Sequence, residues 1–477
     1  MHRLSSLDAQ FLAAEIGNFG AQYCGVALYE TDDRETISAV SMTKRLAERL
    51  HTCPPLRWQL VTVPLDLEHP VFTETAVDLG EHISEATLPE PADEAALADE
   101  VARIMATRLG HDKPLWRLRV LHGLPGRTAV VFTLHHSVVD GIAAGEIFAM
   151  FLDQADPGLV TADTEMSTDD PNRAVLALTG LASMPVRSVR AALSAPKTVG
   201  HLDQVPPLRS LPGVQRLSRA VNPAAPRKAL DAPRTRFNTK LGETRAVAFG
   251  SVSLADVKTV KNAFGITVND VVVAMCGGAL RRRLTATAEL PDDPLVAYLP
   301  VSTRAPDATE RFGNAISSIV APLPTHHADP RERLSFAHEW MARAKARMRQ
   351  APPSLLSDVN DPIPSPVFGM AARGLLGVVS SGLVKPPINL ILSNVPGSPS
   401  PQSCLGAPLR AHYPMSVVFD GFALNITVVS YCDQLDVGIV GDGEALADSW
   451  DLLHDIEAEL DELVATAIGE DHGGQPS

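Results

Sequence analysis

The sequence predicts an α/β fold (α+β in its details) that is built from two halves. Short apolar runs typical of buried strands alternate along the chain with longer segments that carry apolar residues at helical spacing. A proline-rich segment separates two such series. We therefore expect an N-terminal half at 1–152, a linker at 153–243, a C-terminal half at 244–468 and a disordered tail at 469–477.

The composition narrows the class of protein. The 477 residues can bury a large core, and 45% hydrophobic with 20% charged residues is typical of a globular protein. The net charge of −15 disfavours a general affinity for nucleic acid. Five cysteines without a CxxC pair indicate a reducing compartment and offer no zinc motif. The sequence shows neither a signal peptide nor a run of about 20 apolar residues, so we expect a cytoplasmic protein.

The first half opens with a short helix, after which strands and helices alternate. Ser5, with Asp8 three residues later, has the form of a capping box that begins this helix. Trp116 is expected to fill the core, because a tryptophan buries a large area. The expected strands are 23–30, 57–63, 71–75, 117–121 and 129–132, and the expected helices are 38–50 and 94–109.

The predicted linker is basic in an otherwise acidic protein. Between 171 and 240 it carries 12 basic and two acidic residues, a net charge of +10. Its charge leaves three interpretations open: binding to an anionic lipid surface, binding to the phosphates of a substrate, and simple solvation of a linker. An amphipathic helix is expected at 172–193.

Two capping patterns mark helices in the second half. Ser253 with Asp256, and Thr267 with Asp270, precede helices that run to Gly265 and over 271–284. For Asp270 the favoured role is bonding to the backbone of Thr267, and contact with substrate is the alternative. Asn269 has no capping role and is expected to face the substrate.

The rest of the second half continues the alternation. The segment 367–384 is apolar and rich in glycine, and we expect it in the core, with a place on a membrane surface as the alternative. The expected strands are 244–251, 295–304, 315–322, 388–394, 417–419, 424–431 and 435–440, and the expected helices are 330–350 and 446–468.

The candidate site lies where a buried strand meets a helix. The strand 129–132 leads into His135-His136-Ser137-Val138-Val139-Asp140-Gly141, and residues 142–152 follow at helical spacing. Loop residues held by a rigid scaffold often carry catalysis. A histidine with an ordinary pKa of about 6.5 can take a proton from a hydroxyl near neutral pH.

A structural role must be weighed against the catalytic one. A lone histidine beside apolar residues is most often structural. Here two adjacent histidines precede Asp140 and Gly141 at fixed offsets, in a chain with 15 histidines, which makes coincidence a poor explanation. A second pair, His326-His327, lacks the glycine and follows two prolines, so we expect it to be structural or exposed.

The motif resembles that of a known superfamily. His135-His136-x-x-x-Asp140-Gly141 matches the HHxxxDG signature of CoA-dependent acyltransferases, which include chloramphenicol acetyltransferase-like enzymes and peptide-synthetase condensation domains. Further segments, in order along nearly the whole chain, resemble the bacterial wax ester synthase/diacylglycerol acyltransferase family. They are Leu4–Leu12, Pro114-Leu115-Trp116, Asn269-Asp270, Pro300–Arg304, Ser393–Gly397 and Asn425-Ile426-Thr427.

The resemblance implies a fold and a base. The fold would consist of two chloramphenicol-acetyltransferase-like halves with mixed sheets and an active-site tunnel between them. His136 would be the general base that deprotonates an alcohol, with His135 supporting it. Asp140 would point away from the base and pair with an arginine, for which Arg304 is our candidate, and a triad-like contact with His136 is the alternative. Gly141 would allow the tight turn.

The expected function follows from the same resemblance. A long fatty acyl group would pass from acyl-CoA to the hydroxyl of diacylglycerol or of a long-chain alcohol. No covalent intermediate is expected, and the sequence has no GxSxG nucleophile motif. Substrate contacts are expected from Asn269, Asp270, Arg304 and Asn394. Acyl-CoA brings its own thioester, so neither a metal nor another cofactor is implied.

The expected partners are acyl-CoA, the lipid acceptor, and a peripheral membrane or lipid-droplet surface, with no nucleic acid. Two alternative functions remain open. One is ester or amide formation from a carrier-bound acyl donor. The other is a non-catalytic lipid-surface protein that has the same fold.

Overall fold

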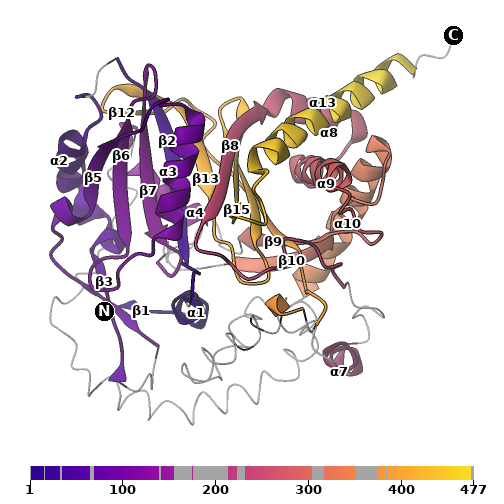
Figure 1. Ribbon diagram of the computed structural model, residues 1–477, viewed down its shortest axis with the longest axis horizontal. Helices are drawn as coiled ribbons and strands as arrows, with labels where there is room; N and C mark the ends of the chain where they lie inside the picture. Colours follow the sequence, from indigo (N-terminus) through magenta and orange to yellow (C-terminus); the bar gives the residue numbers. More distant parts are fainter. Residues whose placement is uncertain are drawn as a thin grey trace.

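Two six-stranded mixed sheets stand side by side in the computed structural model, each formed mainly by one half of the chain (Figure 1). The predicted α/β class with two halves and mixed sheets is therefore confirmed. The structure describes residues 2–15, 17–32, 35–64, 69–138, 141–154, 175, 213–222, 231–302, 316–350, 374, 377, 379–382 and 384–473.

The first sheet carries the candidate site. Its neighbours pair antiparallel, except for the parallel pair at one edge. The spatial order is β12 (Ser403–Cys404), β13 (Ala407–Met415), β2 (Gln22–Glu30), β7 (Arg127–His135), β6 (Trp116–His122) and β5 (Ile83–Thr87). A small sheet of β1 (His2–Arg3), β4 (Val71–Glu74) and β3 (Trp58–Val61) lies in the same half. The helices of this half are α1 (Ser6–Ala14), α2 (Ala39–Arg49), α3 (Glu94–Ala106) and α4 (Gly141–Ala149).

Four of the described helices cover the second sheet. Its order is β10 (Ile316–Pro322), β9 (Val296–Ser302), β11 (Leu390–Val395), β14 (Leu424–Tyr431), β15 (Gln434–Asp442) and β8 (Arg245–Ser253). The helices are α8 (Leu254–Phe264), α9 (Val268–Ala286), α10 (Pro330–Gln350) and α13 (Ser449–Gly473). Most of α9 is buried, because its apolar residues face both the sheet and the neighbouring helices. Among the described residues no single helix is long and apolar enough to cross a membrane; α8 and α9 together would be, but they are bent by 106°.

The two halves share a strand. β13 comes from the second half of the chain but pairs with β2 in the first sheet, as the orange arrow beside the violet ones shows (Figure 1). The sequence pattern does not predict this strand and places one at 417–419 instead, where the structure has a single bridge between Phe419 and Phe422. Pro408 and Pro414 explain the omission, since prolines argue against a strand that is paired on both sides. The exchange places Tyr413 of β13 against Phe249 of β8, with ring centroids 4.7 Å apart, and so helps to join the halves.

Two predicted boundaries differ from the structure. Residues 231–243, which we assigned to the linker, pack in the second half, where Phe237 is fully buried. Helix α13 continues through Gly469 to Gly473, because one glycine costs a helix only about 1 kcal/mol. The predicted helix at 172–193, apart from residue 175, and most of 367–384 lie outside the described residues.

A buried ion pair ties three helices of the second half together. Arg333 of α10 and Glu459 of α13 are 3% and 2% exposed, and the guanidinium lies 2.8 Å from Glu459 Oε1. Arg282 of α9 lies 3.8 Å from Glu459 Oε2. Burial raises the pKa of the Glu459 carboxyl to about 7, although Arg333 opposes that shift.

This raised pKa predicts a pH-dependent stability. Because the folded-state pKa of Glu459 lies above the ordinary value of 4.5, its contribution is fully present below pH 4.5 and is lost as the pH rises through about 7. Between pH 5 and 8 the wild type should lose about 1–3 kcal/mol of unfolding free energy relative to Glu459→Gln. Urea unfolding at a series of pH values measures this difference. Parallel curves for the two proteins would contradict the raised pKa.

Candidate active site

The histidine pair stands at the end of β7, as the sequence predicts. β7 is buried along nearly its whole length, and its last residue, His135, pairs with Gln22 of β2. The N–H of His136 donates to the carbonyl of Ala21 (2.7 Å), and the N–H of Val138 donates to the carbonyl of His135 (3.0 Å). The second bond closes a tight turn, which ends the strand and leads toward α4.

His135 is fully buried and its ring nitrogens have distinct roles. The N–H of Ser137 donates to Nδ1 (3.0 Å), so Nδ1 must present its lone pair. The Ser137 hydroxyl lies 2.7 Å from the same nitrogen. In a neutral imidazole the hydrogen is then on Nε2, which lies 3.3 Å from Oε1 of Glu15.

His136, unlike His135, is only half-buried. Its ring stacks on Phe11 of α1, with centroids 4.3 Å apart and planes at 17°. The two rings have different partners, Glu15 for His135 and Phe11 for His136. Of the two histidines, His136 is the less buried one, and a base must be accessible to an incoming substrate.

Two residues beside the pair were not predicted from the sequence. Glu15, the C-cap of α1, lies between His135 and His111, and His111 Nε2 is 2.9 Å from Glu15 Oε2. Nothing in the local pattern marks either residue, although Glu15 closes the helix that the segment Leu4–Leu12 begins. That helix has the predicted capping box, in which Ser5 and Asp8 bond reciprocally.

Glu15, His111 and His135 have the side-chain types of a metal site. One ligand atom from each lies within 4.8 Å of the others. The hydrogen bonds of His135 disfavour metal binding, because a metal ligand needs a free lone pair on the coordinating nitrogen. With Nδ1 of His135 accepting from Ser137, the facing Nε2 carries the hydrogen and offers none.

The segment Pro114-Leu115-Trp116 is scaffold, as expected. The carbonyl of Leu115 accepts from the N–H of His135 (2.9 Å). The Trp116 side chain is 1% exposed, and its indole N–H donates to the carbonyl of Leu56 (2.8 Å). This strand therefore helps to hold the histidine strand in place.

The predicted substrate contacts of the second half fall into two groups. Asn269 of α9 and Asn394 of β11 come together, with Nδ2 of Asn394 at 3.4 Å from Oδ1 of Asn269. Asp270 is 2% exposed, and its Oδ2 accepts from the N–H of Thr267 (3.0 Å) and lies 2.9 Å from His338 Nδ1. The capping role that the sequence favoured for Asp270 is thus confirmed.

Part of the predicted site lies beyond what the structure describes. Asp140 and Arg304 are outside the described residues, so their proposed pairing stays a prediction. Gly141 is the first residue of α4. In the second half, His326 and His327 lie in the loop before α10, where both rings contact Phe336. This agrees with the structural or exposed role that we expected for that pair.

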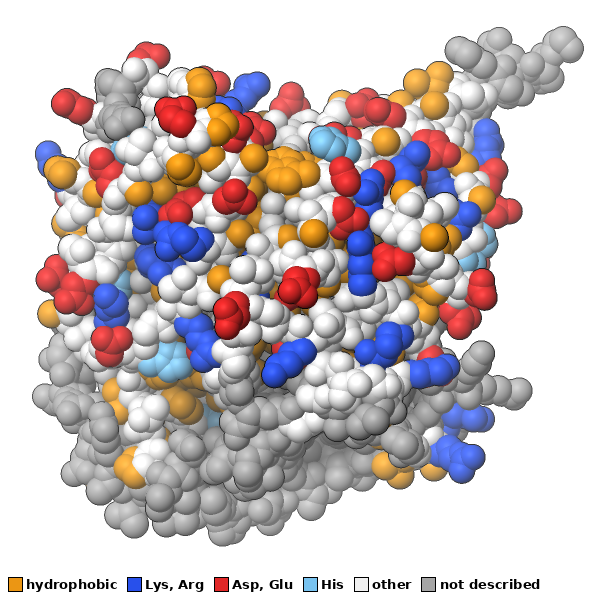
Figure 2. Space-filling model, in the orientation of Figure 1, with side chains coloured by type: hydrophobic (Ala, Val, Ile, Leu, Met, Phe, Trp, Pro, Cys, Tyr) orange, Lys and Arg blue, Asp and Glu red, His pale blue; other side chains and the backbone are white. Residues whose placement is uncertain are grey.

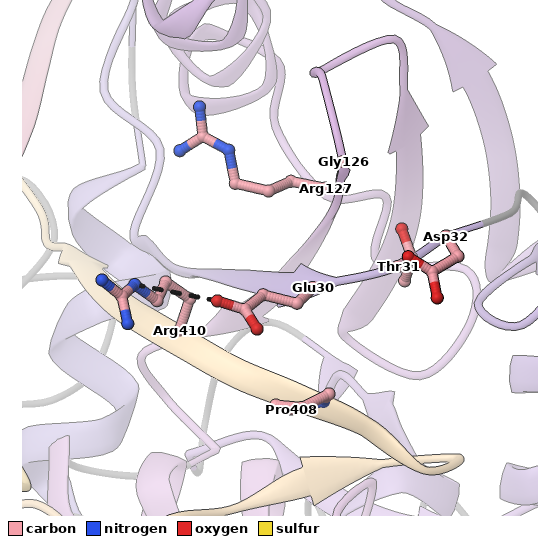
Figure 3. Close-up of a pocket in the computed structure, with 7 residues that line it drawn as sticks. All are labelled: Glu30, Thr31, Asp32, Gly126, Arg127, Pro408 and Arg410. Carbon is pink, nitrogen blue, oxygen red and sulfur yellow. Dashed lines mark ion pairs between the residues drawn. The ribbon is translucent and has the colours of Figure 1, made fainter.

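A surface pocket of about 580 Å³ lies away from the histidines. Figure 3 shows its charged lining, in which Glu30 and Arg410 form an ion pair of 4.0 Å. Glu30 pairs with Arg127 at one end of β2 and β7, whereas His135 is at the other end, eight residues or about 26 Å away. The predicted apolar tunnel is therefore not this pocket and stays a prediction.

Comparisons with known proteins match most of the chain to one family. Residues 4–272 match the wax ester synthase/diacylglycerol acyltransferase catalytic domain, and residues 312–464 match the C-terminal domain of the same family. A putative diacylglycerol O-acyltransferase of Mycobacterium tuberculosis H37Rv is 32% identical over 478 residues, which cover 99% of this chain and 92% of the relative. A probable diacylglycerol O-acyltransferase of the same strain is 30% identical over 468 residues, covering 96% of this chain and 97% of that protein.

Solved structures agree with the sequence comparison. The wax ester synthase/diacylglycerol acyltransferase from Marinobacter aquaeolei VT8 superposes with a TM-score of 0.69 at 26% identity, covering 98% of this chain and 100% of the other. The first condensation domain of the calcium-dependent antibiotic synthetase has a TM-score of 0.57 at 16% identity, covering 98% of this chain and 96% of that one. The second likeness concerns the fold alone.

Proposed function

Because the chain belongs to the wax ester synthase/diacylglycerol acyltransferase family and is an O-acyltransferase, we propose that His136 is its general base. The acyl donor in this proposal is a long-chain acyl-CoA, and the acceptor is diacylglycerol or a long-chain alcohol. The observation that carries the proposal is the half-buried His136, whose ring stacks on Phe11 and whose backbone is bonded at the end of a buried strand.

The proposed reaction needs no covalent enzyme intermediate. As His136 removes the hydroxyl proton, the acceptor oxygen attacks the thioester carbonyl and a carbon–oxygen bond forms. The carbon–sulfur bond then breaks, and the proton passes from the imidazolium to the CoA thiolate, which leaves as the thiol. The donor brings its activated acyl group with it, so we propose no further cofactor.

A product assay tests the donor and the acceptor. Purified protein is incubated with a long-chain acyl-CoA and either a diacylglycerol or hexadecanol, and CoA release and lipid products are followed by mass spectrometry. Triacylglycerol or wax ester with equimolar CoA is expected. A protein that ignores acyl-CoA but uses an acyl group on a carrier protein would replace our donor with the alternative one.

A second part of the proposal concerns location. We propose that the enzyme works in the cytoplasm, at the periphery of the inner membrane or of lipid droplets. Helix α7 (Val214–Val221) supports this, because Leu217 and Val221 are 49% and 46% exposed beside the exposed Arg216 and Arg219. Figure 2 shows basic and hydrophobic side chains together at the lower right, where Figure 1 places α7. Such a helix favours an anionic lipid surface.

Charged residues on the apolar side of α7 should weaken membrane binding. Burying each of these half-exposed apolar side chains in the lipid surface contributes about 1 kcal/mol to binding. Leu217→Asp with Val221→Asp should therefore reduce vesicle affinity at least about tenfold. The measurement is co-sedimentation with phosphatidylglycerol vesicles. Val40→Asp on α2, where Val40 is 80% exposed, is the matched control. Equal binding by all three proteins would remove α7 from the proposal.

A further inference from the structure

The carboxylate of Glu15 occupies a place that is locally unfavourable. Glu15 is the C-cap of α1, where the partial negative charge of the helix end repels a carboxylate. Its side chain is 5% exposed, so it has also lost most of its hydration. Local preference thus opposes a glutamate here. Conflicts of this kind are typical of functional positions, where tertiary contacts stabilise what the local sequence does not.

Those tertiary contacts use both oxygens of Glu15. Oε1 accepts from the N–H of Ala21 (2.8 Å) and lies 3.3 Å from Nε2 of His135. Oε2 lies 2.9 Å from Nε2 of His111, the outermost member of the group, with a side chain 42% exposed. Burial raises the pKa of Glu15, but His111, His135 and the Ala21 amide lower it more, so the pKa stays below its ordinary value.

Two routes lead from α1 to the proposed base. In the first, Glu15 holds the N–H of Ala21, and the carbonyl of the same residue accepts from the N–H of His136. In the second, Glu15 faces Nε2 of His135, and His135 is bonded directly to His136 along the chain. Phe11, one helical turn before Glu15, stacks on the ring of His136. The end of α1 therefore contacts both histidines. Through Ala21 it also helps to fix the backbone of His136.

We propose that Glu15 is a positioning residue for His136: its Oε1 accepts the hydrogen bond that holds Ala21 and faces Nε2 of His135 at 3.3 Å, where it favours the Nε2–H form. This inference rests on the proposed role of His136 as the base. His111 contributes by compensating the buried carboxylate. Glu15 does not touch the reacting atoms in this proposal, and its loss misplaces the base without removing it.

Kinetics of two substitutions at Glu15 test the role. Glu15→Ala removes the acceptor and should lower kcat about 10- to 100-fold, with KM for acyl-CoA little changed, as for other groups that orient a catalytic side chain. Glu15→Gln keeps an oxygen for Ala21 and His135 and should recover most of that loss. Because the neighbouring His111 is exposed, added formate can reach the vacated space and should raise kcat of Glu15→Ala several-fold, whereas chloride should not.

A matched control comes from a second histidine–carboxylate contact in the same half. Glu85 lies 3.2 Å from Nε2 of the buried His122, in strands β5 and β6. Glu85→Ala is the same truncation beside a buried histidine, but it should leave kcat unchanged. Thermal midpoints of all variants, measured under the assay conditions, show whether each protein is folded at the assay temperature.

Nuclear magnetic resonance of ¹⁵N-histidine gives a readout that does not depend on activity. The His135 signal, identified by its loss in His135→Gln, should report hydrogen on Nε2 in the wild type. Hydrogen on Nδ1 would overturn the proposal, as would a folded Glu15→Ala with normal kcat. His136→Ala in the kinetic assay separates the proposed base from the proposed role of Glu15. If His136→Ala stays active, His136 is not the base, whatever the Glu15 variants do.

Discussion

His136→Ala should lower kcat for acyl transfer by about 10²- to 10⁴-fold, because that is the usual contribution of a general base. The substitution removes the imidazole but leaves the buried strand, the turn and the bond from residue 136 N–H to Ala21 intact. The thermal midpoint should therefore change little. CoA release at saturating acyl-CoA and acceptor measures the effect.

The control for this prediction is a histidine of the second pair. His327 lies in a surface loop, 3.1 Å from Glu332, and has no part in the proposed chemistry. His327→Ala should keep wild-type turnover. Near-normal turnover of His136→Ala would contradict the base mechanism, and an equal loss in both variants would point to a general fault of the preparations.

Arg333→Met should lower the free energy of unfolding by about 3–5 kcal/mol, because it removes the nearer and more buried of the two guanidinium groups that face the Glu459 carboxylate. The Arg333 guanidinium bonds Glu459 and also donates to the carbonyls of His327 and Ala328, at 3.3 and 2.7 Å. These contacts join α10 to α13 and to the loop before α10. Urea unfolding at pH 8, where Glu459 is largely ionised, measures the loss.

A double variant distinguishes the lost charge partner from lost packing. In Arg333→Met with Glu459→Met both charges are gone, and well-packed apolar pairs often replace buried ion pairs with little change in stability. Most of the loss should then be recovered. The single variant should also be less unstable at pH 5 than at pH 8, since Glu459 is then protonated and needs no counter-charge. A double variant as unstable as Arg333→Met would mean that packing, not charge, is decisive.

The sequence predicts those parts of the site that depend on nearby residues. Capping of α1 by Ser5 and of α9 by Thr267 follows from spacings of three residues, and both bonds are present. At the start of α8 only half of the predicted box forms: Ser253 accepts from the Asp256 N–H. The end of the buried strand near His135 can also be predicted, because a buried strand has a continuous apolar run.

Other parts could not be predicted, because they join distant segments. Glu15 and His111 are 96 residues apart in the chain, and nothing near either one indicates the other. β13 is separated from its partner β2 by most of the sequence, and its two prolines argue against a strand at this position. Strand pairing of this kind is decided by which surfaces bury each other, and that depends on the whole fold.

The sequence by itself determined the helix caps, most strands and helices, and the place of the histidine motif at the end of a buried strand. These features follow from the spacing of apolar residues and from hydrogen bonds over a few residues. Only the tertiary structure decided that β13 completes the sheet of the other half and that a buried glutamate faces the first histidine. The reason is physical: burial and the compensation of charge act between segments that only the folded chain brings into contact.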